Sequence, residues 1–116
     1  MPFIEWTDVP EERVADGIVR QMVTAEKMMF VRWRFKAGVH VPAHRHPNEQ
    51  MVYVLRGAME LRIEGERRRL RPGQVCWVPE NVEHEAWFFE DTVLTDIFSP
   101  PRQDFLTGQD HYLRRG

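Results

Sequence analysis

Two histidines two residues apart, His44 and His46, are the side chains of this chain whose types and spacing favour metal chemistry. On a β-strand, residues two apart point to the same face, so both imidazoles would aim at one point. Gln50 adds an amide oxygen four residues further on, and His84 lies in a second segment rich in glycine and proline turns. Three imidazoles and one amide oxygen form a donor set for one divalent transition ion. The spacing therefore predicts a metal site, provided that a closed β structure brings His84 to the others.

Glu49 competes with Gln50 for the fourth ligand position, because carboxylates also bind such ions. On a strand, parity places Gln50 on the face of His44 and His46, and Glu49 on the opposite face. We therefore prefer Gln50, while Glu49 stays open as a turn residue or as a residue that orients a ligand. The donor set does not decide among Ni, Zn, Fe and Mn. Neutral ligands leave the charge of the ion uncompensated, which favours an anionic substrate.

Segment 92–98 carries a candidate proton-transfer residue. On a strand, Asp96 and Phe98 share one face with Thr92 and Leu94, so Asp96 either faces solvent or enters the interior together with Phe98. Inside a cavity with a cation, the pKa of Asp96 would be raised by burial or lowered by the ion. In either case Asp96 is the available general acid or base.

Short strands separated by turn signals are expected along most of the chain, without a sustained helical period. This pattern predicts an all-β sandwich or barrel in one domain, residues 1–116, with a core at 14–99 and a tail at 100–116 that holds one helical turn near 103–106. The expected strands are 14–24, 27–36, 41–46, 50–55, 58–63, 67–70, 74–78, 84–89 and 92–98.

Composition excludes several function classes. The 116 residues carry a formal net charge of −2, which gives no electrostatic case for nucleic acid or an acidic membrane. A single cysteine cannot form an internal disulfide. We see no signal peptide and no apolar run of the roughly 18 residues that a membrane span needs. A cytoplasmic protein without nucleic-acid or membrane partners is therefore expected.

The first histidine segment resembles the first motif of the cupin family, small double-sheet β-barrels of the jelly-roll type. That motif is Gly, five residues, His-x-His, three or four residues, Glu or Gln, six residues, Gly. Gly38, His44, His46, Gln50 and Gly57 match it without a gap. The resemblance implies the cupin double-stranded β-helix fold.

The second segment resembles the second cupin motif, which is Gly, five residues, Pro-x-Gly, two residues, His, three residues, Asn. Gly73, Pro79 and His84 match it, whereas Asn81 replaces the middle Gly and Phe88 replaces the final Asn. Asparagine tolerates a left-handed backbone, so the first replacement is compatible with the motif. The second removes a structural polar residue and no metal ligand.

Segments 46–55 and 95–106 resemble the cupins that linearise unsaturated uronates during pectin and alginate breakdown. In that group an Asp and an Arg six residues later serve the substrate, with a Phe two residues after the Asp; Asp96, Phe98 and Arg102 reproduce the spacing. The resemblance implies a metal-dependent enzyme that converts a 4,5-unsaturated uronate, or a similar acidic sugar, from its cyclic to its linear keto form. Asp96 would move the proton, Phe98 would line the pocket, and Arg102 would grip the carboxylate by a bidentate pair.

Two other function classes fit the same site. One is an iron-dependent dioxygenase, because three histidines also suit iron. The other is a ligand-binding or sensory protein in which the metal is structural. The family resemblance also implies a homodimer, for which segment 14–24 is a candidate exchanged edge strand.

Overall fold

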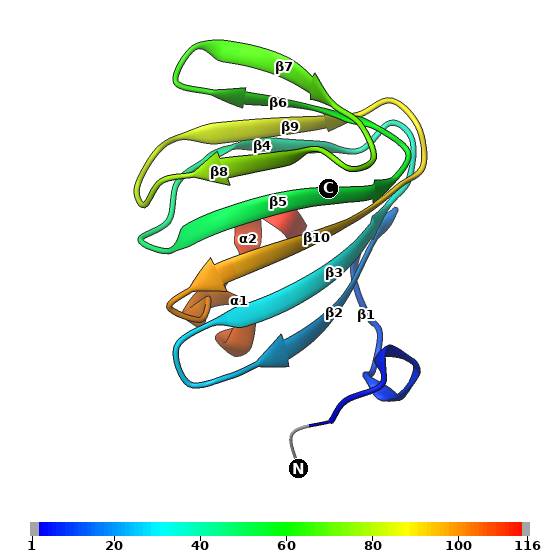
Figure 1. Cartoon of the computed structure of the whole chain (residues 1–116), viewed down its shortest axis with the longest axis vertical. Helices are drawn as coiled ribbons and strands as arrows, with labels where there is room; N and C mark the ends of the chain where they lie inside the picture. The colour runs from blue at the N-terminus through cyan, green and yellow to red at the C-terminus, as the bar shows by residue number, and fades with distance from the viewer. Residues whose placement is uncertain (1–2, 115–116) are drawn as a thin grey trace.

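Ten β-strands in two antiparallel sheets make up the computed structural model, which describes residues 3–114 (Figure 1). One sheet has the order β1-β2-β3-β10-β5-β8, the other β4-β9-β6-β7, so the all-β double-sheet prediction is confirmed. The strands are β1 (Glu12–Ala15), β2 (Ile18–Thr24), β3 (Met29–Phe35), β4 (His40–His44), β5 (Glu49–Arg56), β6 (Met59–Ile63), β7 (Glu66–Leu70), β8 (Val75–Val78), β9 (His84–Phe88) and β10 (Thr92–Ser99). A 3₁₀ turn, η1 (Trp6–Asp8), precedes them, and two short helices, α1 (Gln103–Thr107) and α2 (His111–Arg114), follow.

The alternation of side chains along the central strands decides which of them reach the space between the sheets. In β10, Leu94, Asp96 and Phe98 are buried while Ile97 is exposed. In β5, Gln50 is buried, as are Val52 and Val54. The polar candidates Gln50 and Asp96 thus point inward at the same parity as core valines and leucines. The alternation holds them in the interior although their own chemistry favours water.

The first predicted strand is wrong as a single element. Segment 14–24 forms a hairpin of β1 and β2, because the chain turns at Gly17, whose φ of 77° lies in the left-handed region. β2 pairs with β1 on one side and β3 on the other. β2 therefore has no open edge to which a strand of a second copy could bind. At this end of the sheet the open edge belongs to the four-residue β1.

The predicted strand 41–46 also ends early, at His44, so His46 lies in the loop that follows β4. The loop is held by the backbone N–H of Asn81, which donates to the carbonyl of His46 at 2.8 Å. Asn81 has a φ of 61°, so the expected left-handed backbone at this position is confirmed.

The tail forms α1 and α2, which lie behind β10 and β3 in Figure 1 and cover the space between the sheets. The helical turn expected near 103–106 is present as α1, whereas α2 was not expected. Arg20 of β2 holds the tail: its Nη1 donates to Asp110 at 2.6 Å, and both side chains are fully buried. Among residues 3–114 no helix is both long and apolar enough to cross a membrane.

Candidate metal centre

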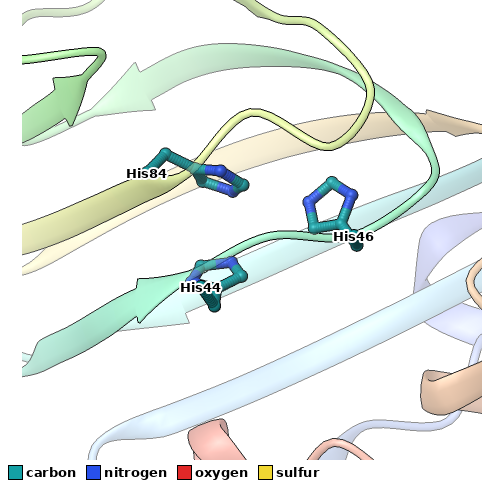
Figure 2. Close-up of side chains that lie close together, drawn as sticks. All are labelled: His44, His46 and His84. Carbon is teal, nitrogen blue, oxygen red and sulfur yellow. The ribbon is translucent and has the colours of Figure 1, made fainter.

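Three histidines from separate segments point toward one another (Figure 2). His44 ends β4, His46 follows in the loop, and His84 begins β9, where it pairs in register with His44. One ring nitrogen from each lies within 4.8 Å of the others. The convergence expected from the sequence is present, although for His46 it comes from the loop rather than from strand alternation.

Each ring is oriented by a backbone carbonyl two residues away. The Nδ1 atoms of His44, His46 and His84 lie 2.8, 3.0 and 2.9 Å from the carbonyl oxygens of residues 42, 48 and 82. A carbonyl only accepts, so each Nδ1 carries the proton and each Nε2 presents a lone pair. The Nε2 of His84 is buried and has no hydrogen-bond partner among residues 3–114. Such an orphaned acceptor beside two others suits a cation.

The three imidazoles are neutral at neutral pH, which is the form that binds metals. Burial, together with the nearby His84, lowers the pKa of His44 to about 3. Burial also lowers the pKa of His46 to about 4, with the charge of Arg102 acting in the same direction. The pKa of His84 is lowered by burial as well.

Gln50 stands beside this group and Glu49 does not. The Oε1 of Gln50 lies 3.0 Å from the Nε2 of His46, whereas Glu49 is exposed and accepts a hydrogen bond from the indole N–H of Trp77 at 2.8 Å. Parity thus placed Gln50 on the histidine side, as expected from the sequence. The three imidazoles with the Gln50 oxygen fit a divalent transition ion in donor type and number.

Asp96 enters the interior rather than facing solvent. It is 7% exposed, and its Oδ1 has no hydrogen-bond partner in the described part of the chain. Burial raises the pKa of Asp96 to about 7, against the opposing influence of the Gln50 side chain and the charge of Arg102. Phe98, two residues on, packs edge-on against His46 with ring centroids 5.6 Å apart. Phe98 therefore contacts the histidine group, and Asp96 lines the same cavity.

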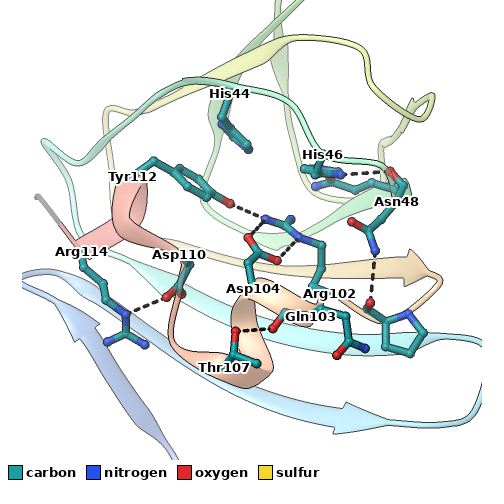
Figure 3. A network of polar contacts seen from close by, with 12 residues as sticks. His44, His46, Asn48, Arg102, Gln103, Asp104, Thr107, Asp110, Tyr112 and Arg114 are labelled. Carbon is teal, nitrogen blue, oxygen red and sulfur yellow. Dashed lines mark hydrogen bonds and ion pairs between the residues drawn. The ribbon is translucent and has the colours of Figure 1, made fainter.

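Arg102 is buried in the wall of the same cavity and is not a solvated tail residue. It is 1% exposed and lies over the rings of Phe98 and Phe105, at 4.8 and 4.0 Å from their centroids. Its Nε and Nη2 donate to the two carboxylate oxygens of Asp104 at 2.9 and 2.8 Å (Figure 3). Nη2 also donates to the hydroxyl of Tyr112 at 2.8 Å.

In this arrangement the guanidinium of Arg102 has no free edge for the bidentate grip on a substrate carboxylate that was expected, and the role of Arg102 stays a prediction. One edge of the guanidinium is filled by Asp104, and Tyr112 takes the remaining N–H of Nη2. A planar guanidinium has two such edges, and both depend on Nη2. Only Nη1 stays available to a ligand.

One cavity collects these groups between the sheets, beneath the tail helices. Apolar side chains from both sheets make up most of its wall, including Trp33 and Phe88. Its polar lining residues are His44, Gln50, His84, Asp96, Arg102 and Tyr112. The cavity thus combines a cation site, a buried carboxyl group and a buried guanidinium, which together suit proton transfer on a small anion.

Two residues that contact Arg102 were not found by sequence reasoning. Asp104 lies two positions beyond Arg102, and this short spacing of opposite charges is a signal that the sequence does contain. Tyr112 belongs to a four-residue helix that no pattern predicted. Its ring stacks on His44, with centroids 4.2 Å apart.

Comparison with known families identifies the fold. A family model described as a cupin domain matches residues 31–97, from β3 to β10. The chain belongs to the cupin family. In sequence, this cupin is 37% identical over 102 residues to the pectin degradation protein KdgF of Dickeya dadantii, covering 85% of this chain and 93% of that protein.

Solved structures agree with this assignment. KdgF from a Halomonas species superposes with a TM-score of 0.85 at 33% identity, covering 90% of this cupin and 98% of that chain. An RmlC-like cupin from Shewanella frigidimarina gives a TM-score of 0.85 at 30% identity, covering 90% and 96%. Oxalate decarboxylase of Bacillus subtilis, at 18% identity, shares the fold alone.

Proposed function

We propose that His44, His46, Gln50 and His84 bind one divalent transition ion, such as Ni, Zn, Fe or Mn. The proposal is supported by three neutral imidazoles whose Nε2 lone pairs face one another beside an amide oxygen. When bound, the ion supplies a Lewis acid that stabilises negative charge on a substrate oxygen. Glu49, on the outside of β5, has no part in the site.

We propose further that this cupin converts a 4,5-unsaturated uronate from its cyclic to its linear keto form. The observation that carries the proposal is that an unpartnered carboxylate oxygen of Asp96 lies in the same cavity as the histidines and a buried arginine. Similarity to a pectin degradation protein over most of both chains supports this class of substrate.

The reaction moves one proton and exchanges no electrons with a co-reactant. Ring opening removes a proton from the hydroxyl on C1, forms the C1 carbonyl and breaks the bond between C1 and the ring oxygen. Tautomerisation of the resulting enol places a proton on C4 and leaves a ketone at C5. Asp96 is the group able to take the first proton and to return it at C4. A single carboxyl group suffices because one proton leaves and one arrives.

Phe98 and Arg102 hold the substrate in this proposal. Phe98 offers an apolar ring face beside His46, against which a sugar ring can pack. Arg102 offers its Nη1 to the substrate carboxylate, and its guanidinium lies over the Phe98 ring at 4.8 Å from the ring centroid. Water is excluded by the aromatic wall and the tail helices, which strengthens both contacts.

The test is turnover of unsaturated galacturonate by metal-loaded protein in D₂O. We expect the absorbance of the conjugated double bond to disappear faster than in buffer, and deuterium to appear at C4 of the product. If the protein does not accelerate this loss of absorbance over buffer, the substrate assignment is wrong. Oxygen consumption by the iron-loaded protein would favour the dioxygenase class, and tight uronate binding without turnover would favour a sensory protein.

We also propose that this cupin forms a homodimer through the outer face of the six-stranded sheet, rather than by strand exchange. Trp77, Met51, Ile97 and Phe30 lie side by side in register across β8, β5, β10 and β3, and each is 39–55% exposed. An apolar row of this extent is unusual on a monomer surface.

The outer face of the other sheet provides the contrast within the same molecule. It carries ion pairs such as Arg62 with Glu85 and Arg67 with Glu60, at 3.0 and 2.7 Å. Depletion of charge at the centre of a patch is the compositional mark of an interface. The cytoplasmic location and the absence of nucleic-acid and membrane partners stay predictions.

A further inference from the structure

Tyr112 has a hydroxyl proton for which the protein offers no acceptor in residues 3–114. The hydroxyl oxygen accepts the Nη2 hydrogen bond of Arg102 at 2.8 Å, so its own hydrogen must point elsewhere. The ring is held in place by its stacking on His44, at 4.2 Å between centroids. The phenol group therefore presents a fixed donor to the cavity that holds the histidines.

Arg102 presents its remaining donors from the adjacent position. Asp104 takes one N–H each from Nε and Nη2, and Tyr112 takes the second N–H of Nη2. All hydrogen bonds of Arg102 to the described residues come from Nε and Nη2, so the two N–H groups of Nη1 have no partner there. Because Arg102 is 1% exposed, bulk water does not readily satisfy them.

The charge of Arg102 is already compensated by Asp104, which is bound side-on. The ion pair of Arg102 and Asp104 has no net charge. The place where an anion binds beside it is therefore decided by the hydrogen-bond donors that point into the cavity. Asp104 acts here as a positioning residue, since its two hydrogen bonds fix the plane of the guanidinium. This arrangement turns Nη1, next to the Tyr112 hydroxyl, toward the cavity.

We infer that the hydroxyl of Tyr112 and the Nη1 of Arg102 together form a carboxylate subsite, in which each donor binds one carboxylate oxygen. The inference rests on the proposed function, and it adds Tyr112 as a residue that selects an acidic sugar over a neutral one. A methyl ester has the same shape near the ring but a much weaker acceptor, so it should gain little from the phenol.

The first experiment measures binding without turnover. Galacturonate and its methyl ester are titrated calorimetrically into the metal-loaded wild type, Tyr112→Phe and Tyr53→Phe. Removing a hydrogen bond to a charged group weakens binding by about tenfold or more. We expect that loss for Tyr112→Phe with galacturonate, little change with the ester, and wild-type affinity for Tyr53→Phe, because Tyr53 lies on the outer face of β5.

The second experiment does not depend on the Tyr112→Phe protein. The chain has only two tyrosines, so Tyr112 is the sole tyrosine of the Tyr53→Phe variant. With ¹³C at the tyrosine ζ carbon, galacturonate should shift that single resonance and glucose should not. Equal affinity of Tyr112→Phe and wild type for galacturonate, or an unmoved resonance at saturation, overturns the subsite.

These readouts separate the subsite from the reaction. If wild-type protein fails to convert the unsaturated uronate but Tyr112→Phe still binds galacturonate more weakly, the proposed reaction falls and the subsite stands. If turnover is normal and Tyr112→Phe behaves as wild type, the reaction stands and the subsite falls. Unchanged metal content and melting temperature of Tyr112→Phe exclude a general disturbance of the fold.

Discussion

The Nε2 of His46 and the Oε1 of Gln50 lie 3.0 Å apart, and each atom presents a lone pair to the other. His46 donates from Nδ1 to the carbonyl of Asn48, so its neutral ring has no second proton to share. Two acceptors at this distance repel unless a cation lies beside both. The pair is thus better suited to joint coordination than to a hydrogen bond.

Replacement of Gln50 by alanine should weaken metal binding by at least about tenfold, because a ligand oxygen is lost. Replacement of Glu49 by alanine should leave the affinity within about twofold, since Glu49 is exposed on the other face. Competition with a chromogenic chelator measures both affinities. Equal losses in the two variants would show that strand parity does not select the ligand.

Metal binding should stabilise the fold through the histidines. A ligand at a hundredfold excess over its dissociation constant stabilises the native state by about 2.7 kcal/mol. We expect Zn²⁺ to raise the melting temperature of wild type by several degrees, EDTA to reverse the gain, and His84→Ala to abolish it. His40→Ala is the matched control, because His40 pairs with Glu85 on the outer face. A gain that persists in His84→Ala contradicts the three-histidine site.

Asp96→Asn should lower kcat by about a hundredfold or more, because the amide cannot exchange the proton. The amide has nearly the same shape, so fold and metal content should be kept. Asp16→Asn, an exposed change in the turn between β1 and β2, should leave kcat as it is. Full activity of Asp96→Asn in the uronate assay removes Asp96 as the proton carrier.

The tail should loosen when its buried ion pair is cut. Burial alone would raise the pKa of Asp110, but hydrogen bonds from Arg114 and Arg20 outweigh it, and the pKa is lowered. The pKa of Glu12, which also bonds both arginines, is lowered against the same effect of burial. The folded state thus binds fewer protons than the unfolded state, so this stability is present above the unfolded pKa of about 4 and is lost as pH falls through the folded value.

Asp110→Asn should accordingly cost about 3 kcal/mol of unfolding free energy at pH 7, because it leaves the buried Arg20 poorly compensated. The pKa of Asp in the unfolded chain is about 4. On acidification below this pH, the variant should lose less stability than wild type. Urea unfolding at pH 7 and at acid pH measures both effects. A variant with the wild-type pH slope would show that Asp110 is not the linked group.

Met51→Glu should disrupt the proposed dimer, because each of the two chains then places a negative charge in the apolar row at the interface. Light scattering should give the mass of two chains for wild type and of one chain for the variant. Glu60→Gln, on the charged sheet, should keep the wild-type mass. A wild-type monomer, or an unchanged mass of Met51→Glu, argues against this interface.

The proposed metal ligands could be predicted from the sequence because the direction of each side chain depends on strand parity and on motif spacing. Parity on β5 separates Gln50 from Glu49, and the two motifs fix the spacing that brings His84 opposite His44. Gly57, which closes the first motif, has a φ of 82°, and a Cβ there would collide with the backbone of Asp91 and Thr92. Such a position accepts only one residue type, so a sequence pattern records it.

The arrangement around Arg102 was not predictable in the same way. Its contacts with Asp104 and Tyr112 depend on the path of a tail that has no period-2 or period-3.6 pattern. That path is set by Arg20, which reaches Asp110 across 90 positions. The hairpin at Gly17 was missed because a strand interrupted by one glycine and two strands joined by a turn have similar sequences.

The three imidazoles are oriented by main-chain oxygens, and this has an evolutionary consequence. No amino-acid replacement at positions 42, 48 or 82 deletes a peptide carbonyl, so the seat for the ion persists while neighbouring side chains vary. Chemistry in such a barrel can diversify by exchange of the surrounding side chains, while the three imidazoles and the backbone that orients them are retained.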